Sequence, residues 1–199
     1  MKKHLCLFLL PALMVVLAGC VEKIKSDVVT FHEGELPRGE SIRIEPLDPR
    51  KKGSLEFHHY ATMVTENLRR IGYTPMEGDQ PTQLVAELDY SISDGLTEVQ
   101  SRPGNYVRYH FWYGHYYDPF YYGFHQDLEP EIYAYTVYNR ILLMNIVRTD
   151  NDKKLYEGRV QSVGPEKEIA KVMPYMITAM FANYPGESGV TKVITIEKK

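Results

Sequence analysis

The stretch EIYAYTVYNRILLMNIVRTDNDKKLYEGRVQSV, residues 131–163, decides the class of fold. Its first part, 131–149, is rich in β-branched and aromatic residues without helical spacing, which indicates one long strand or two abutting strands. Residues 150–154 have the polar composition of a turn, and 155–163 have the composition of a returning strand. The stretch therefore predicts an antiparallel β-hairpin.

Four further segments have the composition or the apolar–polar alternation of strands. Because successive side chains of a strand point to opposite faces, each alternation predicts one face turned toward a core. The segments are 26–33, 41–47 (with Ile42, Ile44 and Leu47 inward), 82–92 (with Leu84, Ala86, Leu88, Tyr90 and Ile92 inward) and 190–197.

Residues 54–72 predict an amphipathic helix. Apolar residues recur there at spacings of three and four, Ser54 can cap the first turn, and Gly72 can end the helix. The apolar stripe consists of Phe57, Tyr60, Ala61, Val64, Leu68 and Ile71.

Residues 164–186 predict a second helix. Pro165 suits its first turn, and Glu166 and Glu168 favour the positive end of its dipole. Pro174 removes one helical hydrogen bond and should kink the helix. Methionines at this spacing pack in a core more often than they bind a partner. The apolar stripe consists of Ile169, Val172, Met173, Met176, Ile177 and Met180.

These elements together predict the class of fold. Both helices carry a single apolar stripe, and several strands alternate rather than being apolar throughout. We therefore expect an α+β fold, in which a mostly antiparallel β-sheet carries two helices packed on one face. With no linker and no repeat in the sequence, a single domain over residues 26–199 is expected.

The first twenty residues, MKKHLCLFLLPALMVVLAGC, have the pattern of an export signal. A basic start precedes an apolar run that is too short to span a bilayer comfortably. The run ends in LAGC, which resembles the lipobox of bacterial lipoproteins. The resemblance implies a signal peptide over 1–19 and lipidation of Cys20, whose sulfur carries diacylglycerol and whose new amino group receives a further acyl chain such as palmitate.

Lipidation at Cys20 would attach the protein permanently to a membrane, because each buried methylene contributes about 0.8 kcal/mol. Residues 20–25 would form the lipidated N-terminus and a short tether. In the sorting rule of enteric bacteria, aspartate at the next position retains a lipoprotein in the inner membrane. Val21 therefore favours the outer membrane, facing the periplasm, without excluding the inner membrane.

Composition limits the partners and the sources of stability. Without Lys2 and Lys3, 21 basic side chains remain against 26 acidic ones, which gives no basic footprint for nucleic acid. Of the two cysteines, Cys6 would leave with the signal and Cys20 would carry lipid, so no disulfide is expected. Stability must come from burial.

Residues 106–125, YVRYHFWYGHYYDPFYYGFH, form an aromatic segment: 11 of the 24 aromatic residues of the chain lie here. We expect a Tyr-rich extended loop or hairpin inserted in the domain. Three roles remain open for its rings: packing on the sheet, binding an envelope protein or peptidoglycan, and contact with lipid headgroups. The candidate binding residues are Tyr109, Trp112, Tyr113, Tyr116, Tyr117, Tyr121 and Tyr122.

The alternative function is enzymatic. His110, His115 and His125 are ligand types for zinc or copper, and they could serve a metal-dependent or glycan-processing envelope enzyme. Their spacing matches no compact ligand motif, and the chain has no nucleophile elbow and no phosphate-binding loop. We therefore expect no catalytic residue, no metal and no cofactor.

Three stretches resemble a family of bacterial lipoproteins known as domain of unknown function 4136. Residues 65–92 resemble the family's helix, Gly-Tyr stop and following strand, and 140–162 resemble its hairpin with an aromatic-x-Gly pair. Residues 171–186 resemble its last helix, which ends in an aromatic residue and proline. The resemblance implies the fold and a membrane location, and the family has no established activity. The expected function is that of a non-enzymatic, membrane-anchored periplasmic lipoprotein with a structural or binding role in the envelope.

Overall fold

The computed structural model describes residues 22–78, 80–102 and 131–198 as an α+β domain. In chain order its elements are β1 (Lys23–His32), β2 (Ser41–Pro46), a short 3-10 helix (Pro49–Lys51), α1 (Leu55–Arg70), β3 (Thr74–Pro75), β4 (Leu84–Ile92), β5 (Leu96–Arg102), β6 (Glu131–Arg148), β7 (Lys154–Gly164), α2 (Ile169–Phe181) and β8 (Thr191–Glu197).

The sheet is mostly antiparallel, as predicted. Its strand order is β3-β2-β4-β6-β7-β1-β8, and β5 pairs with the first part of β6, before the part that pairs with β4. Only β2 is parallel to its neighbours, β3 and β4. The predicted hairpin is β6–β7, joined by a turn in which Asp152 has a φ of 55°. Residues 131–148 thus form one long strand rather than two.

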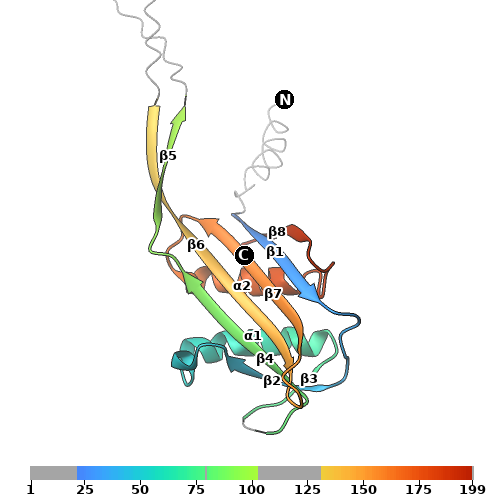
Figure 1. Cartoon of the computed structure of the whole chain (residues 1–199). Helices are drawn as coiled ribbons and strands as arrows, with labels where there is room; N and C mark the ends of the chain where they lie inside the picture. Colours follow the sequence, from blue (N-terminus) through green and yellow to red (C-terminus); the bar gives the residue numbers. More distant parts are fainter. Residues whose placement is uncertain (1–21, 79, 103–130, 199) are drawn as a thin grey trace, which may run out of the picture.

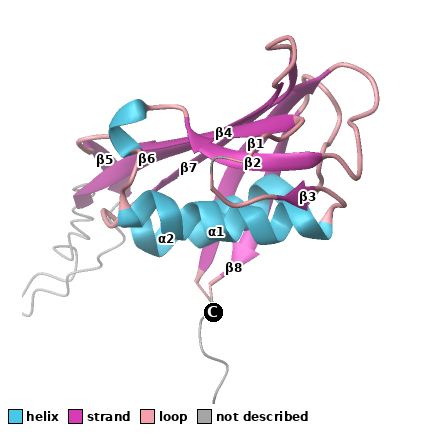
Figure 2. Cartoon of the chain, turned by 90° about the horizontal axis from the view of Figure 1, so that it is seen from below, coloured by secondary structure: helices cyan, strands magenta, loops and turns pink. Residues whose placement is uncertain are grey.

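Both helices lie on the same face of the sheet (Figure 2), which confirms the predicted arrangement. Every second residue of the central strands faces them, because strand side chains alternate. Leu84, Leu88, Leu142 and Met144 are fully buried in this layer. The methionine stripe of α2 also lies in the core, since Met173 and Met176 are fully buried and Met180 is 1% exposed.

The first helix forms as its sequence predicts. The Ser54 hydroxyl accepts the Phe57 amide at 3.4 Å, and Gly72 follows the helix with a φ of 102°, a conformation that favours glycine. The predicted stripe is the buried face, with Ala61 and Ile71 packed at its margin.

The second helix begins later than predicted. It starts at Ile169, so Pro165 and Glu166 precede it, and Glu168 is the N-cap without a side-chain capping bond. The reason is tertiary: the buried Arg140 donates to the Glu166 carbonyl oxygen at 3.1 Å, and the Glu166 carboxylate accepts the Glu168 amide at 2.9 Å. These bonds hold the chain in a turn, and Pro174 lies inside the helix as expected.

Two other predictions need correction at the level of single elements, and two strands were missed. Leu47 is 42% exposed, because the two-residue period places Pro46 rather than Leu47 on the face of Ile42. The first strand begins at Lys23 rather than 26, so residues 23–25, assigned to the tether, belong to the domain. The sequence analysis predicted neither β5 nor the two-residue strand β3.

Candidate functional site

A two-stranded ribbon projects from one end of the sheet (Figure 1). It consists of β5 paired with the first seven residues of β6, from Leu96↔Val137 at its base to Arg102↔Glu131 at its far end. In the sequence, the two strands of the ribbon are separated by residues 103–130, which include the aromatic segment and lie outside the described residues.

The ribbon continues two central strands of the sheet. β4 pairs with β6 as far as Ile92↔Arg140, and after a three-residue break β5 resumes pairing on the same strand. At the break, the Ser93 amide donates to the Asn139 carbonyl at 2.9 Å, and the Asn139 amide donates to the Ser93 hydroxyl at 3.0 Å. Gly95 has a φ of 99°, and an added Cβ would lie 2.9 Å from both Thr136 and Tyr138. The ribbon is thus joined to the body through β6, which pairs with β4 on one side of the break and with β5 on the other.

The start of β1 lies at the same end of the sheet as the ribbon (Figure 1). Asp27 pairs with Gln161 of β7, and Gln161 pairs with Ile141 of β6. Since β1 and β6 both run antiparallel to β7, four residues back along each strand bring Lys23 level with Val137. We call this the anchor end of the domain.

Three lysines at the anchor end form ion pairs with glutamates. The ammonium of Lys23 lies 3.2 Å from the Glu197 carboxylate, and that of Lys198 lies 2.9 Å from Glu22. Lys171, at the start of α2, bridges to Glu168 at 2.8 Å.

A second cluster fastens α1 to β4 beside the base of the ribbon. The Glu56 carboxylate accepts the hydroxyls of Tyr60 at 3.0 Å and Tyr90 at 3.2 Å. Lys51 donates to Asp89 and to the Tyr90 carbonyl, and its ammonium lies 4.0 Å from the centre of the Tyr90 ring. Burial, followed by the nearby Glu56 charge, raises the pKa of Tyr90 to about 12. Each of these side chains contacts another member of the cluster, so we assign the cluster a structural role.

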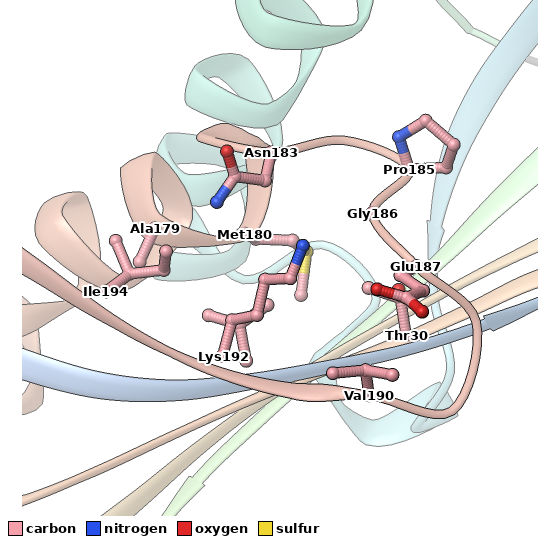
Figure 3. Close-up of a pocket in the computed structure, with 11 residues that line it drawn as sticks. Thr30, Ala179, Met180, Asn183, Pro185, Gly186, Glu187, Val190, Lys192 and Ile194 are labelled. Atoms are coloured by element: carbon pink, nitrogen blue, oxygen red, sulfur yellow. The ribbon is translucent and has the colours of Figure 1, made fainter.

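The hollow shown in Figure 3 is too small for a ligand. It lies between the end of α2 and strands β1 and β8, and side chains such as Met180, Val190 and Ile194 line it. Its volume is about 20 Å³, which is room for about one water molecule.

A larger groove of about 980 Å³ opens at the other end of the sheet, where Arg38, Arg70, Tyr73 and Tyr184 line it with His32. The two tyrosine hydroxyls lie 3.0 Å apart and hydrogen-bond to each other. The ring nitrogens of His32 lie 3.1 Å and 3.2 Å from the carbonyl oxygens of Gly34 and Gly186. The hydroxyls of Tyr73 and Tyr184 and the ring nitrogens of His32 therefore already have hydrogen-bond partners within the domain.

The sequence-predicted site residues lie outside the described part of the chain. This holds for the lipidation residue Cys20, for the seven candidate binding residues (Tyr109, Trp112, Tyr113, Tyr116, Tyr117, Tyr121 and Tyr122), and for His110, His115 and His125. Within the described ranges no three metal-ligand side chains gather at one place, and no helix is long and apolar enough to cross a membrane. The ribbon itself was missed because 96–102 alternates only weakly in hydrophobicity.

A family model decides the classification. The model described as domain of unknown function (DUF4136) matches residues 31–186. The chain belongs to the DUF4136 family. The match covers most of the DUF4136 domain described above, from the end of β1 to the turn after α2. It confirms the resemblance found in the sequence.

Solved structures resemble the DUF4136 domain only distantly. A PDZ domain protein from Parabacteroides distasonis is 9% identical with a TM-score of 0.49, and the match covers 89% of this chain and 40% of that protein. The PelC dodecamer from Paraburkholderia phytofirmans is 12% identical with a TM-score of 0.39, and the match covers 82% of this chain and 99% of PelC. This chain thus spans less than half of the PDZ domain protein. No curated protein matches the sequence.

Proposed function

We propose that this DUF4136 protein is a non-enzymatic lipoprotein, anchored by lipid at Cys20 to the periplasmic face of the outer membrane, with a structural or binding role in the envelope. The observation that carries the proposal is the position of the LAGC motif directly before the folded domain. β1 begins only three residues after Cys20, so the motif stands where an anchor would hold the domain at a membrane surface.

The proposed binding role uses the ribbon and the aromatic segment beyond it. Tyrosine and tryptophan provide large, flat contact surfaces at low entropic cost, and they are enriched in binding sites for this reason. A ribbon built on two central strands would present such a segment at a distance from the body. An envelope protein or peptidoglycan is the proposed partner.

The anchor is tested by metabolic labelling with palmitate followed by intact mass measurement of the purified protein. We expect labelled protein with a mass increase for diacylglycerol and a further acyl chain, and we expect Cys20→Ala to remove all label. Cys6→Ala is the matched control, because it removes the other cysteine from the segment that the signal peptidase discards. An unmodified amino terminus in the wild-type protein would refute the anchor.

Membrane location is tested separately by fractionation of the cell envelope. Wild-type protein should separate with the outer membrane, and Val21→Asp should move it toward the inner membrane if the enteric sorting rule applies. The same distribution for both proteins would remove the argument from Val21 and leave the anchor itself untouched.

The binding role is tested by photocrosslinking in cells. A photoreactive residue at Tyr113 or Tyr121 should capture the same envelope species, whereas one at the exposed Thr178 of α2 should capture none. If Tyr113 and Tyr121 capture nothing more than Thr178 does, the binding role is wrong and a structural role remains.

A further inference from the structure

The ribbon exposes apolar side chains on both of its faces. Leu96 is 66% exposed on one face, and Val99 is 65% exposed on the opposite face. Among the described residues, β5 pairs with β6 alone, and two-stranded ribbons are marginal in water by themselves. Something outside the described domain is therefore needed to bury these side chains.

The ribbon is longer than the largest distance that the residues between Lys23 and Cys20 can span. The ribbon extends over six residue steps from Leu96 to Arg102, or about 20 Å at 3.4 Å per residue. Its base is level with Lys23, and three extended residues from Lys23 to Cys20 span at most about 10 Å. The ribbon projects from the anchor end of the domain (Figure 1). Since it is longer than the span of these three residues, a domain held at the membrane through Cys20 would bring the ribbon into contact with the lipid surface.

We propose that the ribbon is a second membrane contact, in which Leu96 and Val99 enter the headgroup region of the same lipid leaflet that holds the acyl chains of Cys20. The geometry rests on the lipidation proposed above. The protein would then be attached at two points, the acyl chains and the ribbon, and its orientation on the membrane would be fixed.

Lipid fits the ribbon better than a protein partner does. A folded partner that packs on one face would cover Leu96 or Val99 and leave the other side chain in water. Lipid headgroups and acyl chains surround an inserted ribbon and cover both faces. The exposed Glu98 lies beside Tyr135, whose hydroxyl donates to its carboxylate at 2.8 Å, and such polar groups are compatible with the headgroup region rather than with the hydrocarbon core.

The charge distribution defines the kind of lipid surface. The proposed contact is made by Leu96 and Val99, which carry no charge, and Lys23, Lys171 and Lys198 at the anchor end are each paired with a glutamate. We therefore expect binding to zwitterionic phosphatidylcholine vesicles and little effect of salt, because screening weakens only the electrostatic part of membrane binding.

The first experiment places a fluorescent reporter on the ribbon of the lipidated protein. In that protein Cys20 is a thioether and Cys6 is removed, so Val99→Cys supplies the only free thiol. The thiol is labelled with nitrobenzoxadiazole, and the protein is reconstituted in phosphatidylcholine vesicles. Val193→Cys on β8 is the matched control, since Val193 is a strand valine with a nearly equal exposure of 64%.

We expect a rise in emission and a shift to shorter wavelength for the label at position 99, with quenching by doxyl-labelled lipid, and neither effect at position 193. Equal emission at the two positions would overturn the proposal. An emission change at 99 that requires added envelope protein would also overturn it, in favour of a protein partner.

The second experiment uses the mature chain with Cys20→Ser, which has no lipid anchor. Replacing two apolar side chains with serine should weaken vesicle binding by about tenfold, so Leu96→Ser with Val99→Ser is compared with Val193→Ser by co-sedimentation. Binding that disappears in high salt, or that the two substitutions leave unchanged, would contradict the proposal. Because this arm needs no acylation, its result is independent of the palmitate test of the anchor.

Discussion

The ring of Tyr156 lies over Gly158, two residues further along β7 on the same face. A Cβ added at Gly158 would lie 2.5 Å from the Tyr156 hydroxyl oxygen and 2.8 Å from its Cε1. Tyr156 is 1% exposed, and its ring centre lies 4.9 Å from that of Tyr184. The aromatic-x-Gly pair that resembles the family's hairpin is therefore a packing unit, in which glycine leaves room for the ring.

We expect Gly158→Ala to lower the free energy of unfolding by about 1–3 kcal/mol, because the new methyl group overpacks the core. Urea unfolding monitored by circular dichroism measures the change. The matched control is the same substitution in a Tyr156→Leu background, where the contact is absent and the cost should be smaller. Equal costs in both backgrounds would show that the ring does not set the requirement for glycine.

The buried Tyr156 hydroxyl has no hydrogen-bond partner within the described part of the chain. Removing an unsatisfied buried hydroxyl relieves a desolvation cost, so we expect Tyr156→Phe to be neutral or to stabilise the protein by about 1 kcal/mol. Tyr184→Phe is the control: it should destabilise by a similar amount, because it removes the hydrogen bond between the two hydroxyls at Tyr73, a residue that is only 4% exposed. Destabilisation by Tyr156→Phe as large as that by Tyr184→Phe would contradict this account.

Stability should fall in alkaline solution. Burial raises the pKa of Tyr90 to about 12 from an ordinary value of 10.0, and burial also raises the pKa values of Tyr60, Tyr156 and Tyr184. Above pH 10 the unfolded chain releases phenolic protons that the folded protein retains. The stabilisation is therefore complete below the unfolded pKa and is lost as the pH rises toward about 12 and beyond.

The measurement for the alkaline prediction is the urea midpoint at increasing pH, starting near neutrality. Tyr90→Phe should make the decline shallower between pH 10 and about 12, because it removes one of the groups whose pKa differs between the two states. A midpoint that does not change over this range would contradict the prediction.

We expect no stoichiometric metal in the purified protein. The three histidines of the aromatic segment have no compact ligand spacing. Elemental analysis by mass spectrometry checks the prediction, with His115→Ala as the comparison. One zinc or copper per chain that His115→Ala removes would instead favour the metal-dependent enzyme.

Local patterns predicted most elements of the fold. The spacing of Phe57, Tyr60, Val64 and Leu68 identified α1, and the alternation from Leu84 to Tyr90 identified β4, because both patterns reflect which side chains face the core. The prediction failed where a contact between distant residues overrides the pattern. Arg140, for example, holds Glu166 in a turn and delays the start of α2.

The candidate site was predictable only in part. Ring density marked the aromatic segment, and LAGC marked Cys20, since both are features of adjacent residues. The ribbon that connects the segment to the body was not found, because β5 contains exposed polar and apolar residues on both faces. A strand that is not packed against a core has no buried face, so its sequence does not alternate between apolar and polar residues.

The sequence by itself determined the types of the helices and of most strands, the family resemblance and the expected site of lipid attachment, because these depend on neighbouring residues. Only the tertiary structure decided that β5 and β6 continue past the sheet and that Lys23 lies level with Val137. Strand order and register depend on hydrogen bonds and side-chain contacts between residues that are distant in the sequence, by more than a hundred positions for β1 and β7, and no local pattern contains that information.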